Sequence, residues 1–308
     1  ASVTVRELLS HAGGLVRDGV DGDFWQLTTP FPDTASLLRL AGDADVKVLS
    51  PSDRFKYSNI GFALLGQVLE AVTGVPYGEH VRRSVIEPLG LVHTTPELQR
   101  EHLAEHATGY SSLAYGDRRL PIDHVATGAM AAATGFSSTA DDLVRYAAAH
   151  FDTDRRLLGG RSHRQMRHVE RDAGNGTQYG LGFALAKVAG RQVVGHGGGF
   201  PGFITRTWFD PVDRLAVSVL TNAIDGPALA YATAALRFVE LAGKATHDPA
   251  VGDMDLSRFC GRFATLWGVF DIVALGGRLH EIALAAPDPL PDAAVLTVVD
   301  ADTLRVER

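Results

Sequence analysis

The stretch of sequence that decides the fold is Phe55-Lys56-Tyr57-Ser58-Asn59-Ile60-Gly61-Phe62-Ala63-Leu64-Leu65-Gly66. Its second half opens a series of apolar residues at helical spacing, which comprises Ile60, Leu64, Leu65, Val68, Leu69 and Val72. Gly74 follows at the place where a helix commonly ends in a left-handed residue. The pattern predicts a buried helix that starts near Asn59.

The triplet Tyr57-Ser58-Asn59 at the start of this helix has two interpretations. The pattern alone favours a capped helix start, because short polar side chains satisfy free backbone N–H groups there. The alternative is chemical: Tyr57 accepts or donates a proton, and the Asn59 amide contacts a substrate carbonyl.

Composition excludes several classes of protein. The 308 residues are 45% hydrophobic and 21% charged, which excludes a disordered chain, a collagen-like repeat and a disulfide-stapled miniprotein. The formal net charge of −7 argues against a chain-wide cationic surface for nucleic acid. Cys260 is the only cysteine, so no internal disulfide or Cys-x-x-Cys metal pair exists. Apolar runs stay shorter than the roughly 18 to 20 residues of a membrane span.

Helices are expected mainly in the first half of the chain. Thr4-x-x-Glu7 has the spacing of a capping box and predicts a short helix. Residues 14–37 are rich in Gly, Asp, Thr and Pro and predict a long surface loop, whose Phe24 and Trp25 either wall a pocket or enter the nearest core. A helix is predicted from Pro76 toward Val85, and another from 138 to 150.

After residue 178 the sequence pattern changes from helical to strand-like. Short runs of residues that favour strands, at 181–188, 191–195, 204–209 and 215–221, predict antiparallel strands. A helix is expected over 228–242. We therefore predict a main domain over 1–244, a linker over 245–255 and a strand-rich segment over 256–308, in which about four strands can be drawn.

Residues 194–202 read Val-Gly-His-Gly-Gly-Gly-Phe-Pro-Gly and lie between two predicted strands. Because glycine has no Cβ, a ligand can approach this backbone, and its N–H groups can stabilise an oxyanion with His196 at the rim. A glycine-rich turn without function is an equal alternative. A phosphate loop is disfavoured, since no Gly-Lys-Ser/Thr is present and a strand follows.

Two further motifs bear on the class of enzyme. His102-Leu103-Ala104-Glu105-His106 matches the H-x-x-E-H zinc pattern, but its polar surroundings favour a solvated surface turn over a metal site. No Gly-x-Ser-x-Gly occurs, which argues against an α/β-hydrolase.

Six segments in a fixed order are more informative than any one of them: TVRELLSHAGGL at 4–15, FKYSNIGFALLG at 55–66, EPLGL at 87–91, STADDL at 138–143, GHGGGFPG at 195–202 and LTN at 220–222. Together they resemble the serine β-lactamase-like superfamily, in particular its branch of class C β-lactamases, D-alanyl-D-alanine peptidases and esterases. The resemblance implies an α+β fold in which an antiparallel sheet is flanked by helices.

The same resemblance implies a site and a reaction. Tyr57 is the general acid or base beside the reacting serine, and the backbone N–H of Gly199 is half of the oxyanion hole. The substrate-binding residues are Asn59, His196, Gly197 and Gly198, the last three standing in place of a Lys-Thr-Gly box. The substrate is a small molecule or peptide carrying an ester or amide, and neither a cofactor nor a metal is implied. A neutral imidazole in place of lysine favours an esterase or D-amino-acid peptidase over a β-lactamase.

The nucleophile of this family is a serine in a Ser-x-x-Lys motif. The lysines here are Lys47, Lys56, Lys187 and Lys244, and none has a serine three residues before it. We therefore expect the chain to be a fragment whose nucleophile lies upstream and which is inactive alone. The alternative is a non-catalytic binding protein of this fold. Residues 256–308 resemble the start of a small β-barrel, which is expected to be incomplete.

Overall fold

The computed structural model describes residues 2–19, 22–113, 116–243, 254–283 and 293–307. The chain divides into two compact units, Ala1–Leu229 and Ala230–Arg308. Each unit is described by itself.

The first unit combines helices with a six-stranded antiparallel sheet. Its helices and helical turns are α1 (Val5–Leu9), η1 (Asp23–Gln26), α2 (Thr34–Gly42), η2 (Ala44–Val46), α3 (Asn59–Thr73), α4 (Tyr77–Val81), η3 (Arg82–Ile86), α5 (Glu87–Leu89), η4 (Arg100–His102), η6 (Gly128–Met130), α6 (Ala131–Thr134), α7 (Ala140–Ala148) and α8 (Gly160–Met166). Its sheet has the strand order β3-β4-β5-β6-β7-β8.

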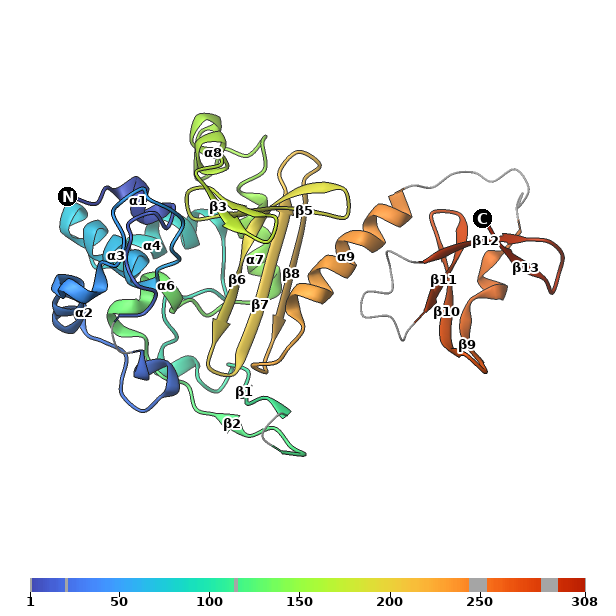
Figure 1. Cartoon of the computed structure of the whole chain (residues 1–308), viewed down its shortest axis with the longest axis horizontal. Helices are drawn as coiled ribbons and strands as arrows, with labels where there is room; N and C mark the ends of the chain where they lie inside the picture. Colours follow the sequence, from blue (N-terminus) through green and yellow to red (C-terminus); the bar gives the residue numbers. More distant parts are fainter. Residues whose placement is uncertain (1, 20–21, 114–115, 244–253, 284–292, 308) are drawn as a thin grey trace. The chain divides into compact units, whose positions relative to one another are not determined.

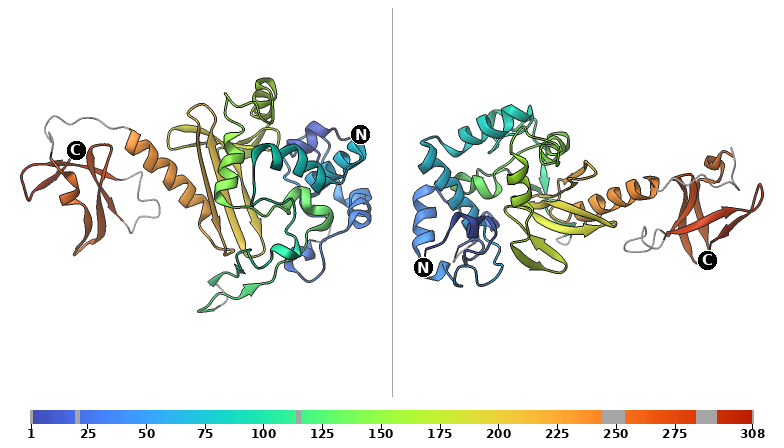
Figure 2. Two further views of the ribbon diagram at one scale, coloured as in Figure 1. Left: turned by 180° about the vertical axis from the view of Figure 1, so that it is seen from behind. Right: turned by 90° about the horizontal axis from the view of Figure 1, so that it is seen from above.

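The strands of this sheet are β3 (Arg171–Gly174), β4 (Thr177–Tyr179), β5 (Ala184–Val188), β6 (Arg191–Phe200), β7 (Phe203–Asp210) and β8 (Leu215–Thr221). A separate pair, β1 (Gly109–Tyr110) and β2 (Pro121–Ile122), forms a small antiparallel ribbon. Figure 1 shows α1 to α4 and α6 gathered beside the sheet, and Figure 2 shows α7 lying against it from behind. The predicted α+β class is therefore confirmed.

Helix ends follow the signals in the sequence. Thr4 and Glu7 form the predicted capping box at α1, and the Ser58 hydroxyl accepts a hydrogen bond from Gly61 N–H at the start of α3. Gly74 ends α3 with φ of +68°, a conformation that favours glycine. The position of Tyr57 is thus set by a fixed helix start.

The core of the helical layer is built around α3. Ile60 and Ala63 are fully buried in one cluster with Phe31, Leu37 and Met130. On the sheet, Val194 and Phe209 pack with Phe183 and with Ala147 of α7. The helical layer and the sheet therefore each have a packed core.

Two local predictions are wrong. The predicted loop 14–37 ends early, because Asp33 caps α2 by accepting from Ser36 N–H. The glycine run after Gly195 is not a turn between strands but the second half of β6, and only Pro201-Gly202 turns the chain into β7. The neighbouring strand holds these glycines in an extended conformation that their low β-propensity does not predict.

The second unit takes up α9 (Ala228–Gly243) from Ala230 onward and carries η7 (Leu256–Phe259) and a five-stranded antiparallel sheet. Its strands are β9 (Gly261–Thr265), β10 (Gly268–Leu275), β11 (Arg278–Ala283), β12 (Ala294–Val298) and β13 (Leu304–Val306). The structure thus has one more strand than the four predicted. Most of the predicted linker, residues 245–253, lies outside the described residues.

No single helix within the described ranges has both the length and the apolar character needed to cross a membrane. One pair, Asn59–Thr73 with Tyr77–Leu89, meets that criterion only when its two helices are taken together, and these are bent by 81°.

Replacement of Ile60 by alanine is expected to destabilise the first unit by about 2 to 5 kcal/mol, because it leaves a cavity in the core around α3. Val72→Ala on the same helix is the matched control, since Val72 is 81% exposed and should change stability by less than about 0.5 kcal/mol. Urea unfolding followed by circular dichroism measures both. Equal effects of the two substitutions would contradict the assigned core.

Candidate active site

The second half of β6 has a free edge. Pairing between β5 and β6 ends at Ala184 with Gly195, whereas pairing between β6 and β7 continues to Phe200 with Phe203. From His196 to Phe200 the strand therefore has a partner on one side only, as far as the described residues show. Gly198 and Gly199 are exposed.

The register decides which glycines face this edge. Phe200 and Phe203 flank a two-residue turn, and such flanking residues exchange both of their hydrogen bonds. The pattern alternates along the strand, so His196 and Gly198 also bond toward β7, while Gly197 and Gly199 direct their N–H and C=O groups to the free edge. The Gly199 N–H is therefore available to an oxyanion.

Tyr57 lies beside His196 of β6. Its ring centroid is 6.0 Å from that of His196, and the Arg17 guanidinium carbon is 5.7 Å from the Tyr57 ring. Burial raises the pKa of Tyr57, Arg17 opposes that shift and Asp18 adds to it. Tyr57 is consequently a neutral phenol near pH 7, able to donate or accept one hydrogen bond.

His196 is a half-buried, neutral imidazole. Its Nδ1–H donates to the Gly197 carbonyl, which leaves Nε2 as an acceptor. Burial lowers the pKa of His196 and Arg206 lowers it further, although the hydrogen bond to Gly197 acts in the opposite direction. His196 therefore supplies no fixed cation at neutral pH.

Asn59 is buried, and its amide is already bonded within the protein. The Nδ2 group donates to Asp18 Oδ1 at 2.7 Å, and Asp18 forms an ion pair with Arg17 at 3.2 Å. The backbone N–H of Asn59 donates to the Arg17 carbonyl at 2.8 Å. Contact between Asn59 and a substrate stays a prediction.

His11 and Tyr179 are the residues of the site that sequence reasoning missed. His11 is 3% exposed, and its Nδ1 accepts from the Ser58 N–H at 3.1 Å. Its Nε2 is therefore protonated and donates to the Tyr179 hydroxyl, also at 3.1 Å. The ring centroids of His11 and Tyr57 are 4.2 Å apart. One imidazole thus fixes both tyrosines and joins α3 to β4.

The backbone at His11 is itself unusual. Its φ is +54°, in the left-handed region that non-glycine residues seldom adopt. The His11 carbonyl accepts from Lys56 N–H at 2.7 Å, which ties this turn to the segment carrying Tyr57. The only signal in the sequence was a histidine directly before Ala12-Gly13-Gly14.

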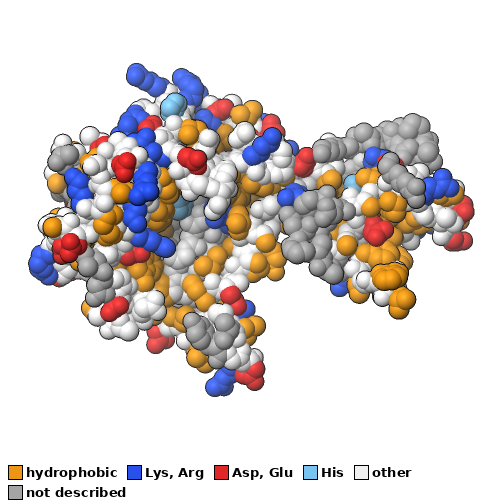
Figure 3. Space-filling view, in the orientation of Figure 1, with side chains coloured by type: hydrophobic (Ala, Val, Ile, Leu, Met, Phe, Trp, Pro, Cys, Tyr) orange, Lys and Arg blue, Asp and Glu red, His pale blue; other side chains and the backbone are white. Residues whose placement is uncertain are grey.

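Aromatic side chains pack at the end of the glycine strand. Phe24 is buried in the helical core, whereas Trp25 is half-buried and lies 6.3 Å from Phe200 between ring centroids. Phe31 stacks on Phe200 at 6.0 Å. Of the two interpretations left open for these aromatics, the core applies to both, since Trp25 and Phe200 pack against the cluster that contains Phe24 and Phe31. Figure 3 shows Lys and Arg side chains along the helical side of a shallow recess, with histidine atoms visible inside it.

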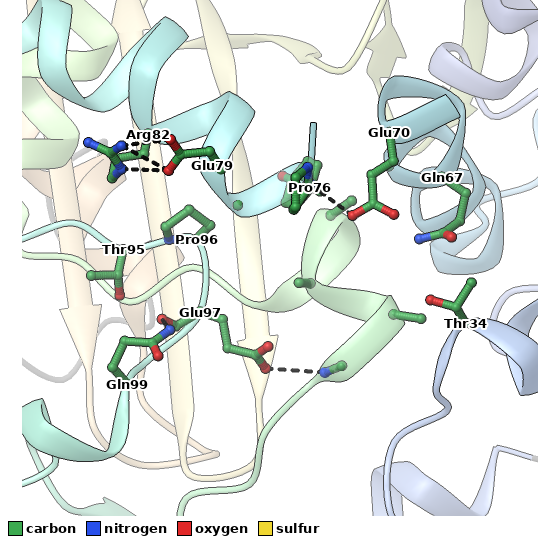
Figure 4. Close-up of a pocket in the computed structure, with 17 residues that line it drawn as sticks. Thr34, Gln67, Glu70, Pro76, Glu79, Arg82, Thr95, Pro96, Glu97 and Gln99 are labelled. Carbon is green, nitrogen blue, oxygen red and sulfur yellow. Dashed lines mark hydrogen bonds and ion pairs between the residues drawn. The ribbon is translucent and has the colours of Figure 1, made fainter. Parts of the chain in front are cut away.

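A hollow of about 490 Å³ lies elsewhere in the helical layer and contains none of the predicted site residues (Figure 4). Its carboxylates hold other parts of the protein: Glu70 accepts from Tyr77 N–H at 2.7 Å, Glu97 accepts from the Thr127 hydroxyl at 2.7 Å, and Glu79 pairs with Arg82. These carboxylates therefore hold the helical layer together, and the hollow is not assigned as the active site.

The motif His102 to His106 ends beside the turn from β6 into β7. His102 ends the short turn η4, and the His106 ring packs against His124 and Phe203. Within the described part of the chain, no group of three or more His, Cys, Asp or Glu side chains is arranged to hold a metal ion.

Comparison with known proteins agrees with this geometry. The beta-lactamase family model matches residues 1–241. The chain belongs to the beta-lactamase family. The resemblance seen in the sequence is thereby confirmed, and the family is one of serine hydrolases.

Curated relatives include penicillin-binding proteins. The chain is 25% identical to penicillin-binding protein 4* of Bacillus subtilis, over 66% of this chain and 48% of that protein. It is 29% identical to penicillin-binding protein 4 of Amycolatopsis lactamdurans, over 79% of this chain and 65% of that protein. The chain thus spans between about half and two thirds of the length of these two relatives.

Solved structures show the same fold. An octameric penicillin-binding protein homologue from Pyrococcus abyssi has a TM-score of 0.69 at 24% identity, with 99% of this chain and 71% of that chain covered. A D-amino acid amidase from Ochrobactrum anthropi has a TM-score of 0.55 at 27% identity, with 71% of this chain and 64% of that chain covered.

The neutral state of His11 makes stability depend on pH. Burial lowers the pKa of His11 to about 3, from an unfolded value of 6.5. Between these pH values the unfolded state binds a proton that the folded state does not, so stability falls as pH falls through that range. This side chain alone should make the protein about 1.4 kcal/mol less stable at pH 5.5 than at pH 7.5.

His11→Asn tests this prediction, because asparagine tolerates positive φ and can accept from Ser58 but does not titrate. Its loss of stability between pH 7.5 and 5.5, measured by urea unfolding, should be smaller than that of the parent by about 1.4 kcal/mol. The exposed His168→Asn is the control and should retain the full pH dependence. An unchanged pH dependence in His11→Asn would contradict the assignment.

Proposed function

We propose that this protein is a serine hydrolase that cleaves an ester or amide through an acyl-serine, with a D-amino-acid peptide or simple ester as substrate. The observation that carries the proposal is the free edge of β6: Gly199 offers its N–H there, and Tyr57 lies across the same cleft, 6.0 Å from the His196 ring. Names of relatives that support it include the D-aminopeptidase of Gluconobacter oxydans and the D-amino acid amidase of Ochrobactrum anthropi.

In the proposed mechanism the substrate lies extended along the free edge, antiparallel to β6, as an added strand. The serine oxygen attacks the carbonyl carbon and gives its proton to the Tyr57 hydroxyl oxygen, while the neutral Tyr57 phenol passes its own proton to the departing nitrogen or oxygen. Gly199 N–H stabilises the negative charge that develops on the carbonyl oxygen. The bond to the protonated leaving group then breaks, and Tyr57 is again a neutral phenol. Water then attacks the acyl-serine by the reverse path, which releases the acid and the free serine.

The proposal places the nucleophile outside these 308 residues, because none of the four lysines follows a serine at the Ser-x-x-Lys spacing. The chain by itself is then expected to be inactive. The competing proposal is a non-catalytic protein that binds peptides in the same cleft. The encoded sequence before Ala1 distinguishes them, since a Ser-x-x-Lys there supports the enzyme and its absence rejects it.

Tyr57→Phe, made in the protein expressed from the complete reading frame, should lower p-nitrophenyl ester turnover by about a hundredfold or more, because the proton carrier is lost. Tyr231→Phe is the matched control, since Tyr231 is 59% exposed on α9 and far in sequence from the site motifs. Steady-state kinetics with a folding check by circular dichroism measures the effect. Turnover within twofold of the parent in Tyr57→Phe would remove Tyr57 from the mechanism.

A further inference from the structure

The tip of the hairpin between β9 and β10 exposes two large apolar side chains. Leu266 is 94% exposed and Trp267 is 93% exposed, more than any other large hydrophobic residue that the structure describes. Pairing of the two strands reaches Thr265 with Gly268, so Leu266 and Trp267 form a two-residue turn. Such turns favour Gly, Asn and Asp, so the needs of the turn do not explain a leucine and a tryptophan there. Figure 3 shows hydrophobic side chains gathered at the end of this hairpin, which Figure 1 marks with the β9 label.

The end of the hairpin carries no charge. Residues 263–270 read Phe-Ala-Thr-Leu-Trp-Gly-Val-Phe, and we call them the finger. The finger ends at Arg262 and Asp271, which are directly opposite each other and are joined by two hydrogen bonds of 2.8 and 3.0 Å. At about 3.3 Å per strand residue, the tip lies about 10 Å beyond this ion pair. The hairpin therefore has an apolar end and a charged base whose two charges cancel.

The finger is apolar on both faces of its two strands. Phe263 and Phe270 are directly opposite each other, and their rings stack with centroids 5.8 Å apart. Ala264 and Val269 form the next pair, and their side chains therefore lie on the other face. Val269 is 41% exposed and Phe263 is 42% exposed. A finger that is apolar all round suits a medium that surrounds it, rather than a flat protein surface.

The polar groups of the finger are mostly used within the hairpin. The Thr265 hydroxyl accepts from Trp267 N–H at 3.2 Å and donates to the Gly268 carbonyl at 3.4 Å. The alternation of the ladder leaves Ala264 and Val269 with N–H and C=O groups that point away from the hairpin. These groups remain hydrated in the interfacial zone of a bilayer, whereas they would lose water in its hydrocarbon core. Entry to a shallow depth is therefore compatible with the backbone.

The size of the apolar area favours lipid over a second copy of the chain. The exposed parts of Phe263, Leu266, Trp267 and Val269 amount to roughly 500 Å². A stable interface between two proteins buries about 800 Å² on each partner. Insertion into a lipid interface requires no matching surface of this size, because each apolar side chain leaves water independently.

We propose that the finger inserts into the interfacial zone of a phospholipid bilayer with zwitterionic headgroups and thereby binds the chain reversibly to membrane surfaces. Its length of about 10 Å matches the roughly 5 to 10 Å to which apolar groups enter that zone. Tryptophan is enriched at this level of membranes, and Arg262 with Asp271 stays in water. The net charge of −7 disfavours anionic lipids. One small apolar anchor gives weak binding, with an association constant on the order of 10⁴ M⁻¹.

Vesicles of dioleoylphosphatidylcholine test the proposal with the 308-residue chain. Most of the protein should sediment with vesicles at about 2 mM lipid. The part of the tryptophan emission that is lost in Trp267→Phe should shift to shorter wavelength when vesicles are added. Binding should change less than about twofold between roughly 0.05 and 0.5 M salt, because it is not electrostatic. Replacement of a third of the lipid by phosphatidylserine should weaken it.

Substitutions at the tip assign the binding to the finger. Leu266→Ser combined with Trp267→Ser should lower the association constant by about tenfold or more, because two apolar side chains are removed. Val72→Ser combined with Val92→Ser is the matched control, since these valines are 81% and 79% exposed in the first unit, and it should bind as the parent does. Circular dichroism checks folding. A parent that does not sediment with the vesicles, or a double-serine variant at the tip that binds equally well, would overturn the proposal.

Sedimentation velocity without lipid distinguishes membrane binding from self-association. The parent and the double-serine variant at Leu266 and Trp267 should sediment as the same species. An oligomer that forms only in the parent would identify a second copy as the occupant of the finger and reject the bilayer. None of these measurements requires hydrolysis, so the inference stands or falls separately from the proposed function.

Discussion

The site depends on one buried imidazole that connects two layers of the fold. His11 follows α1, accepts from Ser58 N–H at the N-cap of α3 and donates to Tyr179 of β4. Because the ring is neutral and both of its nitrogens form hydrogen bonds, its tautomer and its orientation are both fixed. The distance between the Tyr57 segment and β4 is thereby set by hydrogen bonds, rather than by apolar packing that tolerates small shifts.

Residues with strong local signals were predictable from the sequence. Thr4 with Glu7, Ser58 and Gly74 mark helix ends through caps that act within a few residues, and the structure has each of them. The strand Leu215–Thr221 was predicted with its exact bounds. The site residues Tyr57 and Gly199 came from the order of motifs in a known family, and their catalytic and oxyanion roles stay predictions.

Other features depend on contacts between segments that are distant in sequence, so the neighbouring residues gave no pattern from which to predict them. His11 gains its role from Ser58 and Tyr179, which are 47 and 168 residues away in sequence. The glycines after Gly195 have low intrinsic preference for strands, and only pairing with β7 makes them extended.

The free edge of β6 also bears on how tightly anything can remain bound there. An unpaired strand edge invites pairing with any extended chain, which threatens a protein with self-association. Here the edge runs only from His196 to Phe200, and three of these five residues are glycines, which offer an added strand no side chain to pack against. Backbone pairing alone is then too weak to retain a passing strand, and a ligand needs a side-chain anchor as well. In the proposed hydrolase the same weakness would favour rapid departure of a cleaved product, so the composition of one strand would limit aggregation and product inhibition together.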